Sequence, residues 1–298
     1  MSLLKRMARS RWPALVDLGR SDTSGSLIAS LSPRSTREAD FLARYGPWAL
    51  VAGASEGLGA AFAERLAGLG LNLILVARRP EPLAAMATAL PTRTITVSAD
   101  LATVDGLRQV CDATAGLDVG LVVANAAYSP IGRFIDMDPE QTNLALDLNC
   151  RAPLELAHRF LPTMASRRRG GFIIMSSLAG MQGSPPISVY AATKAFGAIL
   201  AEGLWAELRG TGVDVLTCVA GAVATPGLAG AKSRPAPGTQ SAQQVAEAAL
   251  HALGRGPRVT PGLTMRLSSA VMSRLLPRRA AIAVIARASR DLTPPSLS

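Results

Sequence analysis

The amino-acid sequence predicts an α/β protein built on a doubly wound, mostly parallel sheet of seven strands. Between residues 46 and 262, short apolar runs alternate with amphipathic stretches of helical spacing. Strands that read as continuous apolar runs are typical of a parallel sheet covered by helices on both faces. The 298 residues, 49% of them hydrophobic, contain ample material for one such core. We therefore expect a single domain with an extension at each end.

The strands of this domain are short and bounded by glycine or polar residues. We expect them at residues 48–53, 71–77, 94–100, 119–126, 170–177 and 213–220, with a weaker seventh near 258–260. Helices are expected between them at residues 60–70, 81–90, 104–115 and 188–209, with another ending near Met164. The arginine run at residues 167–169 predicts an exposed helix-to-strand turn. Ligands of doubly wound folds bind at the carboxyl ends of the strands.

The formal net charge of +10 is concentrated at the two ends of the chain. Residues 1–45 hold eight basic and four acidic residues, and residues 264–298 hold six arginines and one aspartate. We expect residues 1–45 to form a basic extension and residues 263–298 a basic, helical one. Such segments either contact an anionic surface such as a membrane or remain solvated. The near-neutral body and the few aromatic residues argue against nucleic acid as a partner.

The numbers of cysteines and histidines limit the kinds of catalytic or metal site that the chain can form and indicate the redox state of its compartment. Three widely spaced cysteines without a CxxC motif favour a reducing, cytoplasmic setting. Two histidines argue against a zinc site or a histidine-based nucleophile, so we expect no metal. The apolar runs are too short for a membrane span, and the N-terminus lacks a secretory pattern. We expect a cytoplasmic protein, with membrane association through the basic ends as an alternative.

The first predicted strand runs into the sequence GASEGLG. Glycines there permit a tight turn and a close approach of the backbone to a pyrophosphate, and the amides that open the next helix face the phosphates. The turn therefore predicts a dinucleotide site that includes Gly53, Ser55, Glu56, Gly57, Leu58 and Gly59.

The second predicted strand ends without the acidic residue that grips the ribose hydroxyls in NAD sites. The guanidinium groups of Arg78 and Arg79 suit the 2′-phosphate of NADP(H), and the alternative is a solvated turn. Glu56 places negative charge nearby, so NADP(H) is preferred and NAD(H) stays an alternative. After the third strand, Asp100, followed by Leu101, is placed either to accept from an adenine amino group or to cap the next helix.

Five motifs occur in a familiar order. They are GASEGLG, Asn-Ala-Ala at residues 125–127, Asn149, Ser-Ser-Leu-Ala-Gly at 176–180 and Tyr-Ala-Ala-Thr-Lys at 190–194. Together they resemble the short-chain dehydrogenase/reductase (SDR) family over roughly residues 46 to 262. The lead-in ARYGPWALVAGASEGLG resembles the branch of 3-oxoacyl-thioester and 17β-hydroxysteroid reductases. The resemblance implies a Rossmann-type fold and an NAD(P)-dependent oxidoreductase.

The resemblance also implies a catalytic tetrad of Asn149, Ser177, Tyr190 and Lys194. The neighbouring Ser176 is set aside because the serine of the family lies thirteen residues before its tyrosine. In the family, the tyrosine is the general acid or base and the serine polarises the carbonyl. The lysine binds the nicotinamide ribose, and the asparagine holds a water. Further cofactor contacts are implied at Asn125, Ala126, Ala127, Val223 and Thr225.

Elementary chemistry supports the tyrosine and lysine of this tetrad. Tyr190 and Lys194 are four residues apart, so their side chains share one face of a helix. A nearby ammonium is expected to lower the pKa of the phenol toward neutrality, where a general acid works best. Alanine replaces residues usual in the family at Ala52, Ala124, Ala127 and Ala220, and none of these changes removes a reacting group.

The expected substrate lip combines Tyr128, Met181, Gln182 and Ile187 with a loop at about residues 225–240 that is rich in Pro and Gly. These residues are mostly apolar or small, which favours a hydrophobic carbonyl or secondary alcohol of 3-oxoacyl, steroid-like or polyketide-like type. A catalytically idle NADP(H)-binding sensor or scaffold is the alternative. Small residues of the 188–209 helix would permit close packing between copies, so we expect a homodimer or homotetramer: Gly197, Ala198, Ala201 and Gly203.

Overall fold

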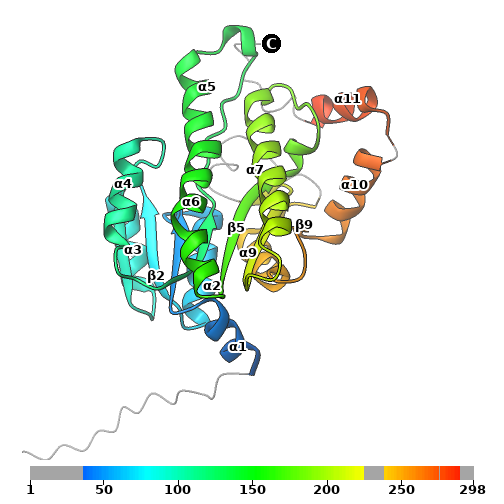
Figure 1. The fold of residues 1–298 in the computed structure, drawn as a ribbon. Helices are drawn as coiled ribbons and strands as arrows, with labels where there is room; N and C mark the ends of the chain where they lie inside the picture. Colours follow the sequence, from blue (N-terminus) through cyan, green and yellow to red (C-terminus); the bar gives the residue numbers. More distant parts are fainter. Residues whose placement is uncertain (1–35, 225–237, 275, 289–298) are drawn as a thin grey trace, which may run out of the picture. The chain divides into compact units, whose positions relative to one another are not determined.

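The computed structural model describes residues 36–224, 238–274 and 276–288. A parallel sheet of seven strands lies at the centre, in the order β3-β2-β1-β4-β5-β6-β9, with helices on both sides (Figure 1). The predicted fold class is confirmed, including the weak seventh strand. The strands are β1 (Trp48–Ala52), β2 (Asn72–Ala77), β3 (Thr94–Ser98), β4 (Val119–Ala124), β5 (Gly170–Ser177), β6 (Val213–Ala220) and β9 (Arg258–Val259).

Helices connect these strands, with short irregular turns between some of them. The helices are α1 (Thr36–Tyr45), α2 (Gly57–Gly68), α3 (Pro80–Ala89), α4 (Val104–Ala113), α5 (Pro139–Leu146), α6 (Ala152–Ser166), α7 (Ser188–Glu207), α9 (Ala242–Ala252), α10 (Leu263–Arg274) and α11 (Arg278–Ala288). The short turns are η1 (Phe134–Asp136), η2 (Asp147–Arg151) and η3 (Leu178–Met181). A separate two-stranded sheet pairs β7 (Val223–Ala224) with β8 (Gln240–Ser241).

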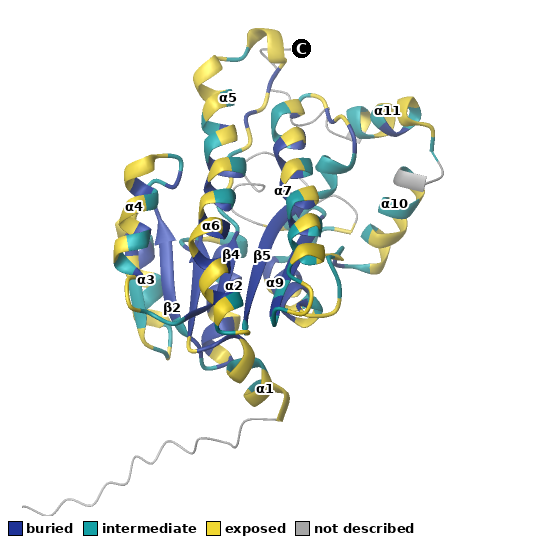
Figure 2. Cartoon of the chain, in the orientation of Figure 1, coloured by how far each residue is buried: buried dark blue, intermediate teal, exposed yellow. Residues whose placement is uncertain are grey.

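Two apolar clusters bury the two faces of the main sheet. On one face, alternate residues of β1 and β2 pack with α2 and α9, and Phe62 and Leu66 are fully buried there. On the other face, the intervening strand residues pack with α4, α6 and α7. Figure 2 shows the strands as the most deeply buried part of the chain. Burial on both faces explains why the strands read as continuous apolar runs.

The order of the strands reverses between β1 and β4, which lie side by side at the centre of the sheet. Ala52 pairs with Ala124, so Gly53 and Asn125 leave their strands next to each other. The crevice at such a reversal is the usual ligand site of open α/β sheets. The fold therefore brings the glycine turn and the 125–127 segment to one place.

The folded body begins before the expected boundary at residue 46. Tyr45, the last residue of α1, is 4% exposed, and its phenol donates a hydrogen bond of 2.7 Å to Oδ2 of Asp214. Arg44 forms an ion pair of 2.6 Å with the same carboxylate. Helix α1 thus belongs to the domain, because two of its side chains bind the start of β6.

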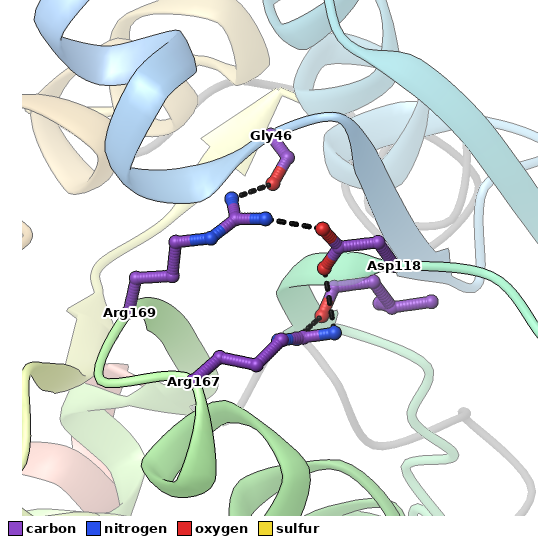
Figure 3. Close-up of polar contacts among 5 residues, drawn as sticks. Gly46, Asp118, Arg167 and Arg169 are labelled. Carbon is purple, nitrogen blue, oxygen red and sulfur yellow. Dashed lines mark hydrogen bonds and ion pairs between the residues drawn. The ribbon is translucent and has the colours of Figure 1, made fainter.

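The arginines at residues 167–169 are not a simple exposed turn. Asp118 lies between the guanidinium groups of Arg167, at 2.5 Å, and Arg169 (Figure 3). Arg169 also donates to the carbonyl of Gly46 at 2.7 Å, and Arg167 donates to that of Val119 at 2.8 Å. Both side chains are half-buried, so this cluster joins three segments at the amino end of the sheet. The run does form the turn between α6 and β5, but the expectation that its side chains are exposed was wrong for Arg167 and Arg169.

Three of the four small residues of α7 face the sheet rather than another copy of the chain, whereas Gly203 is exposed. Gly197, Ala198 and Ala201 are buried, and a Cβ placed on Gly197 would lie 3.1 Å from Cγ2 of Ile174. They therefore allow α7 to approach β5 closely. The outward side of α7 carries Ile199, which is 65% exposed. A homo-oligomer stays a prediction, without support from these three residues.

Candidate active site

A pocket of about 740 Å³ opens at the carboxyl ends of β1, β2, β3 and β4. Twelve of the residues expected to bind the cofactor line it: Gly53, Ser55, Glu56, Gly57, Leu58, Arg78, Arg79, Asp100, Leu101, Asn125, Ala126 and Ala127. Sequence reasoning missed Ala77, Ala99 and Leu148, which also line it. Ala77 precedes Arg78 and Ala99 precedes Asp100 in the sequence. Their positions next to these expected contacts at strand ends could have identified them.

The glycine turn is shaped for close approach of a phosphate. Gly53 and Gly57 have φ angles of +75° and +58°, a region that side chains other than glycine rarely adopt. Glu56 precedes α2 and makes no side-chain cap, so its carboxylate does not occupy the first amides of the helix. Gly59 serves packing instead, because a Cβ there would lie 1.9 Å from the carbonyl oxygen of Gly53. These features fit the pyrophosphate of a dinucleotide.

The rim of this pocket carries charge of both signs. Arg79 and Glu56 form an ion pair of 2.8 Å, and both side chains are about half exposed. Arg78 lines the same rim, and its carbonyl accepts a hydrogen bond from Ser98. The carboxylate of Asp100 accepts from the amide of Ala102 at 3.0 Å while also lining the pocket. One of the two expected arginines therefore already binds the neighbouring carboxylate.

Asn125 and Asn149 anchor the loop that leaves β4. The side-chain amide of Asn125 donates to the carbonyls of Ala52 and Gly53 at 3.3 and 3.2 Å. Asn149 is 4% exposed and exchanges two hydrogen bonds of 2.8 Å with the backbone of Tyr128. Together they fix both ends of the 125–128 segment, which runs from the pocket toward α7.

Asn149 lies in η2, a π-helical turn between α5 and α6. Its amide also donates to Oγ1 of Thr193 at 2.9 Å, and that hydroxyl donates to the carbonyl of Tyr190 at 2.8 Å. Thr193 is 1% exposed and was not anticipated. The signal was its position inside the 190–194 motif, where a helical hydroxyl can bond the carbonyl one turn back.

The two adjacent serines at the end of β5 have different partners. Ser176 is buried, and its hydroxyl donates to the carbonyl of Lys194 at 2.7 Å, which holds α7 against the strand. The side chain of Ser177 lies close enough to the phenol of Tyr190 to lower its pKa, and its oxygen accepts from the amide of Ala179. The structure thus brings Ser177 and Tyr190 together.

Burial raises the pKa of the Tyr190 phenol above its usual value, and the nearby side chain of Ser177 lowers it. The expectation that Lys194 lowers this pKa toward neutrality was wrong, because burial dominates even though the ammonium nitrogen lies 5.5 Å from the centre of the tyrosine ring. Lys194 is itself 6% exposed. Burial lowers its pKa to about 8, and the nearby thiol of Cys150 acts in the opposite direction. Its ammonium donates to the carbonyl of Met175 at 2.9 Å.

The residues expected to form the substrate lip are less uniform. Met181 is half-buried, whereas Gln182 and Ile187 are 5% and 9% exposed and therefore offer little surface to a ligand. Tyr128 packs partly against the sheet. Val223, expected to contact the cofactor, lies in β7 and packs against the core, and Thr225 lies outside the described residues. Most of the expected 225–240 loop also lies outside them.

Comparison with known proteins agrees with this geometry. The family model "short chain dehydrogenase" matches residues 47–235. A 7beta-hydroxysteroid dehydrogenase of Collinsella aerofaciens is 34% identical over 189 residues, 62% of this chain and 72% of that protein. A very-long-chain 3-oxoacyl-CoA reductase of Podospora anserina is 33% identical over 180 residues, which cover 57% of this chain and 53% of that protein.

Two solved structures have the same fold. One comes from work on the stereoselectivity of 7beta-hydroxysteroid dehydrogenase, with a TM-score of 0.78, 28% identity, and coverage of 82% of this chain and 98% of that one. The other is a short-chain dehydrogenase from Sphingobium yanoikuyae in complex with NADPH, with a TM-score of 0.67, 28% identity, and coverage of 77% and 94%. The chain belongs to the short-chain dehydrogenase family. It is an NAD(P)-dependent oxidoreductase.

Proposed function

We propose that the protein is an NADP(H)-dependent oxidoreductase that interconverts a carbonyl and a secondary alcohol on a hydrophobic substrate of steroid or 3-oxoacyl type. One observation carries the proposal. The side chain of Ser177 lies within interacting distance of the Tyr190 phenol, and Asn149 connects the helix of Tyr190 to the loop that leaves the dinucleotide pocket. Two hydroxyls arranged in this way can bind one carbonyl oxygen.

The protein's part of the reaction is the movement and placement of a proton. The bound nicotinamide supplies or accepts the hydride at the substrate carbon. The phenol of Tyr190 donates a proton to the substrate oxygen during reduction and accepts it during oxidation. Ser177 donates a hydrogen bond to the same oxygen and polarises the carbonyl. Because burial raises the pKa of Tyr190, the phenol retains its proton at neutral pH.

Lys194 and Asn149 act on Tyr190 without contacting the substrate, the first by its charge and the second by hydrogen bonds. The ammonium of Lys194 favours the phenolate that remains after proton donation, since opposite charges a few ångströms apart attract in a buried site. A pKa of about 8 leaves this ammonium able to exchange its proton near neutral pH. Asn149 and Thr193 hold the backbone of Tyr128 and Tyr190 in one hydrogen-bonded group, which fixes the phenol relative to the pocket.

The preference for NADP(H) rests on the arginines at the end of β2. Arg78 and Arg79 line the pocket at the position where a 2′-phosphate would lie in a doubly wound fold. Glu56 neutralises part of the charge of Arg79, so Arg78 is the principal candidate for phosphate binding. The NADPH complex of the Sphingobium relative supports this assignment.

The test is a panel of hydroxysteroids, oxosteroids and 3-oxoacyl thioesters, assayed with NADP(H) and with NAD(H). We expect turnover with NADPH, and a loss of about 10²- to 10⁴-fold in kcat for Tyr190→Phe with NADPH affinity retained. Ser177→Ala should lose far more activity than the matched variant Ser176→Ala, because Ser176 binds only the backbone of α7. Turnover that survives in Tyr190→Phe would contradict the mechanism.

The idle alternative predicts a different outcome of the same panel. An NADP(H)-binding sensor would bind NADPH in a calorimetric titration and yet turn over none of the substrates.

A further inference from the structure

We propose that the outward faces of α10 and α11 dock on the surface of an anionic lipid bilayer. This inference goes beyond the oxidoreductase chemistry and does not depend on it. The two helices lie beside the body on the side of η3 and the N-terminal part of α7, in orange and red in Figure 1. No helix in the described ranges is long and apolar enough to cross a membrane, so the proposed contact is with the bilayer surface.

The inner faces of both helices are held on the body. Arg278 donates to the carbonyl of Met181 at 2.8 Å, and Ala281 is 1% exposed. Met265 fits against Gly221 so closely that a Cβ on this glycine would lie 2.6 Å from the sulfur. Because their inner faces contact the domain, the opposite faces of α10 and α11 are held in fixed orientations.

The outward side of α10 carries a stripe of exposed apolar side chains. Leu263, Leu267 and Val271 are 71%, 59% and 43% exposed, and each lies one turn after the last. On α11, Val284 is 43% exposed. Single exposed apolar residues are ordinary, but three at a spacing of four form a continuous strip along a helix. Moving such a strip from water into the interfacial region of a bilayer is favourable, because apolar surface is removed from water.

Basic residues flank this strip. Arg266, Arg279 and Arg287 are exposed, and neither helix contains an aspartate or glutamate. Exposed leucines next to arginines are typical of a helix that lies in the interfacial region of an anionic membrane. A second copy of the chain is a poorer occupant, since a two-fold contact would bring the same arginines of both copies together.

The experiment is flotation of the full chain with vesicles of phosphatidylcholine alone, or of phosphatidylcholine mixed with phosphatidylglycerol. We expect binding to the mixed vesicles only, and its loss at high salt, which screens exposed charges. The triple variant Arg266→Gln, Arg279→Gln, Arg287→Gln should bind on the order of 100-fold more weakly. The control Arg65→Gln, Arg108→Gln, Arg159→Gln loses the same charge elsewhere and should bind at least tenfold better than the triple variant.

A second pair of variants tests the apolar strip. Leu263→Ser should weaken binding several-fold, whereas Val104→Ser, at an equally exposed position of α4, should not. Circular dichroism and thermal midpoints verify that each variant is folded. The proposal is overturned if the wild type stays unbound, or if the α10–α11 arginine variant binds as tightly as its control. It is also overturned if Leu263→Ser lowers the mass measured by light scattering and leaves vesicle binding unchanged, because the strip would then join two copies.

Discussion

Replacing Lys194 by methionine should abolish activity and reverse part of a stability penalty that the enzyme carries at neutral pH. Burial lowers the pKa of Lys194 from 10.5 to about 8. A tenfold change in proton affinity corresponds to about 1.4 kcal/mol, so keeping this ammonium charged in the folded state costs about 3 kcal/mol at pH 7. Methionine removes that cost. It also leaves the carbonyl of Met175 without its partner, which costs about 1–3 kcal/mol.

The dependence on pH separates these two effects. The folded pKa is lower than the unfolded one, so between about pH 8 and 10.5 the unfolded chain binds more protons. Stability of the wild type therefore rises with pH through this window, relative to a variant without the amine. Between about pH 7 and about pH 10, the difference in unfolding free energy should move about 2–3 kcal/mol in favour of the wild type.

Urea denaturation of Lys194→Met and wild type at several pH values measures this difference. Ser176→Ala is the matched control, because it removes a neighbouring buried hydrogen bond without removing a titrating group. The difference between Ser176→Ala and wild type should stay constant over the same range. If the Lys194→Met difference is equally flat, then Lys194 does not carry a lowered pKa, and the reasoning from its burial is refuted.

Three further predictions concern the pocket and its support. Gly59→Ala should abolish folding or cofactor binding because its Cβ would overlap the carbonyl of Gly53, while Gly68→Ala, with open space around it, should change the thermal midpoint little. Asn149→Ala should lower the unfolding free energy in urea by about 3–5 kcal/mol, since three hydrogen bonds are lost; exposed Asn143→Ala should change it by less than about 0.5 kcal/mol. Glu56→Gln should tighten NADPH binding about two- to fivefold in calorimetry by freeing Arg79, with little change for NADH. These assignments would be contradicted if Gly68→Ala were more damaging than Gly59→Ala, or Asn143→Ala more destabilising than Asn149→Ala. An equal gain in NADH affinity for Glu56→Gln would contradict the third.

The fold was predictable from sequence because its strands are buried on both faces. The strands β1, β2, β4, β5 and β6 are mainly apolar runs that end next to a glycine or polar residue, whereas the edge strands β3 and β9 are partly exposed and gave a weaker pattern. Twelve of the fifteen residues lining the pocket were predictable for a related reason. They follow strand ends, and parallel strands bring their carboxyl ends to one edge of the sheet. The tetrad needed the family resemblance, because a tyrosine and a lysine four residues apart also fit an ordinary helix surface.

Contacts between segments distant in the chain were not predictable from local pattern. Arg167 and Arg169 read as exposed charges, and only the fold brings Asp118 between them. The spacing of Gly197, Ala198 and Ala201 on α7 could not say that they face β5, or that Gly203 faces outward. In the same way, Glu56 and Arg79 are 23 positions apart and meet because the glycine turn follows β1, the neighbour of β2.

The hydrogen bonds of Asn149 join the two halves of the site. On one side, Asn149 holds Tyr128, which directly follows Ala127 in the lining of the dinucleotide pocket. On the other side it holds Thr193, which bonds the carbonyl of Tyr190 and precedes Lys194 in α7. A shift in the 125–128 loop must therefore move the phenol or break a buried hydrogen bond, which costs about 1–3 kcal/mol. One buried amide therefore joins the lining of the dinucleotide pocket to the helix that carries the phenol proposed as the proton donor.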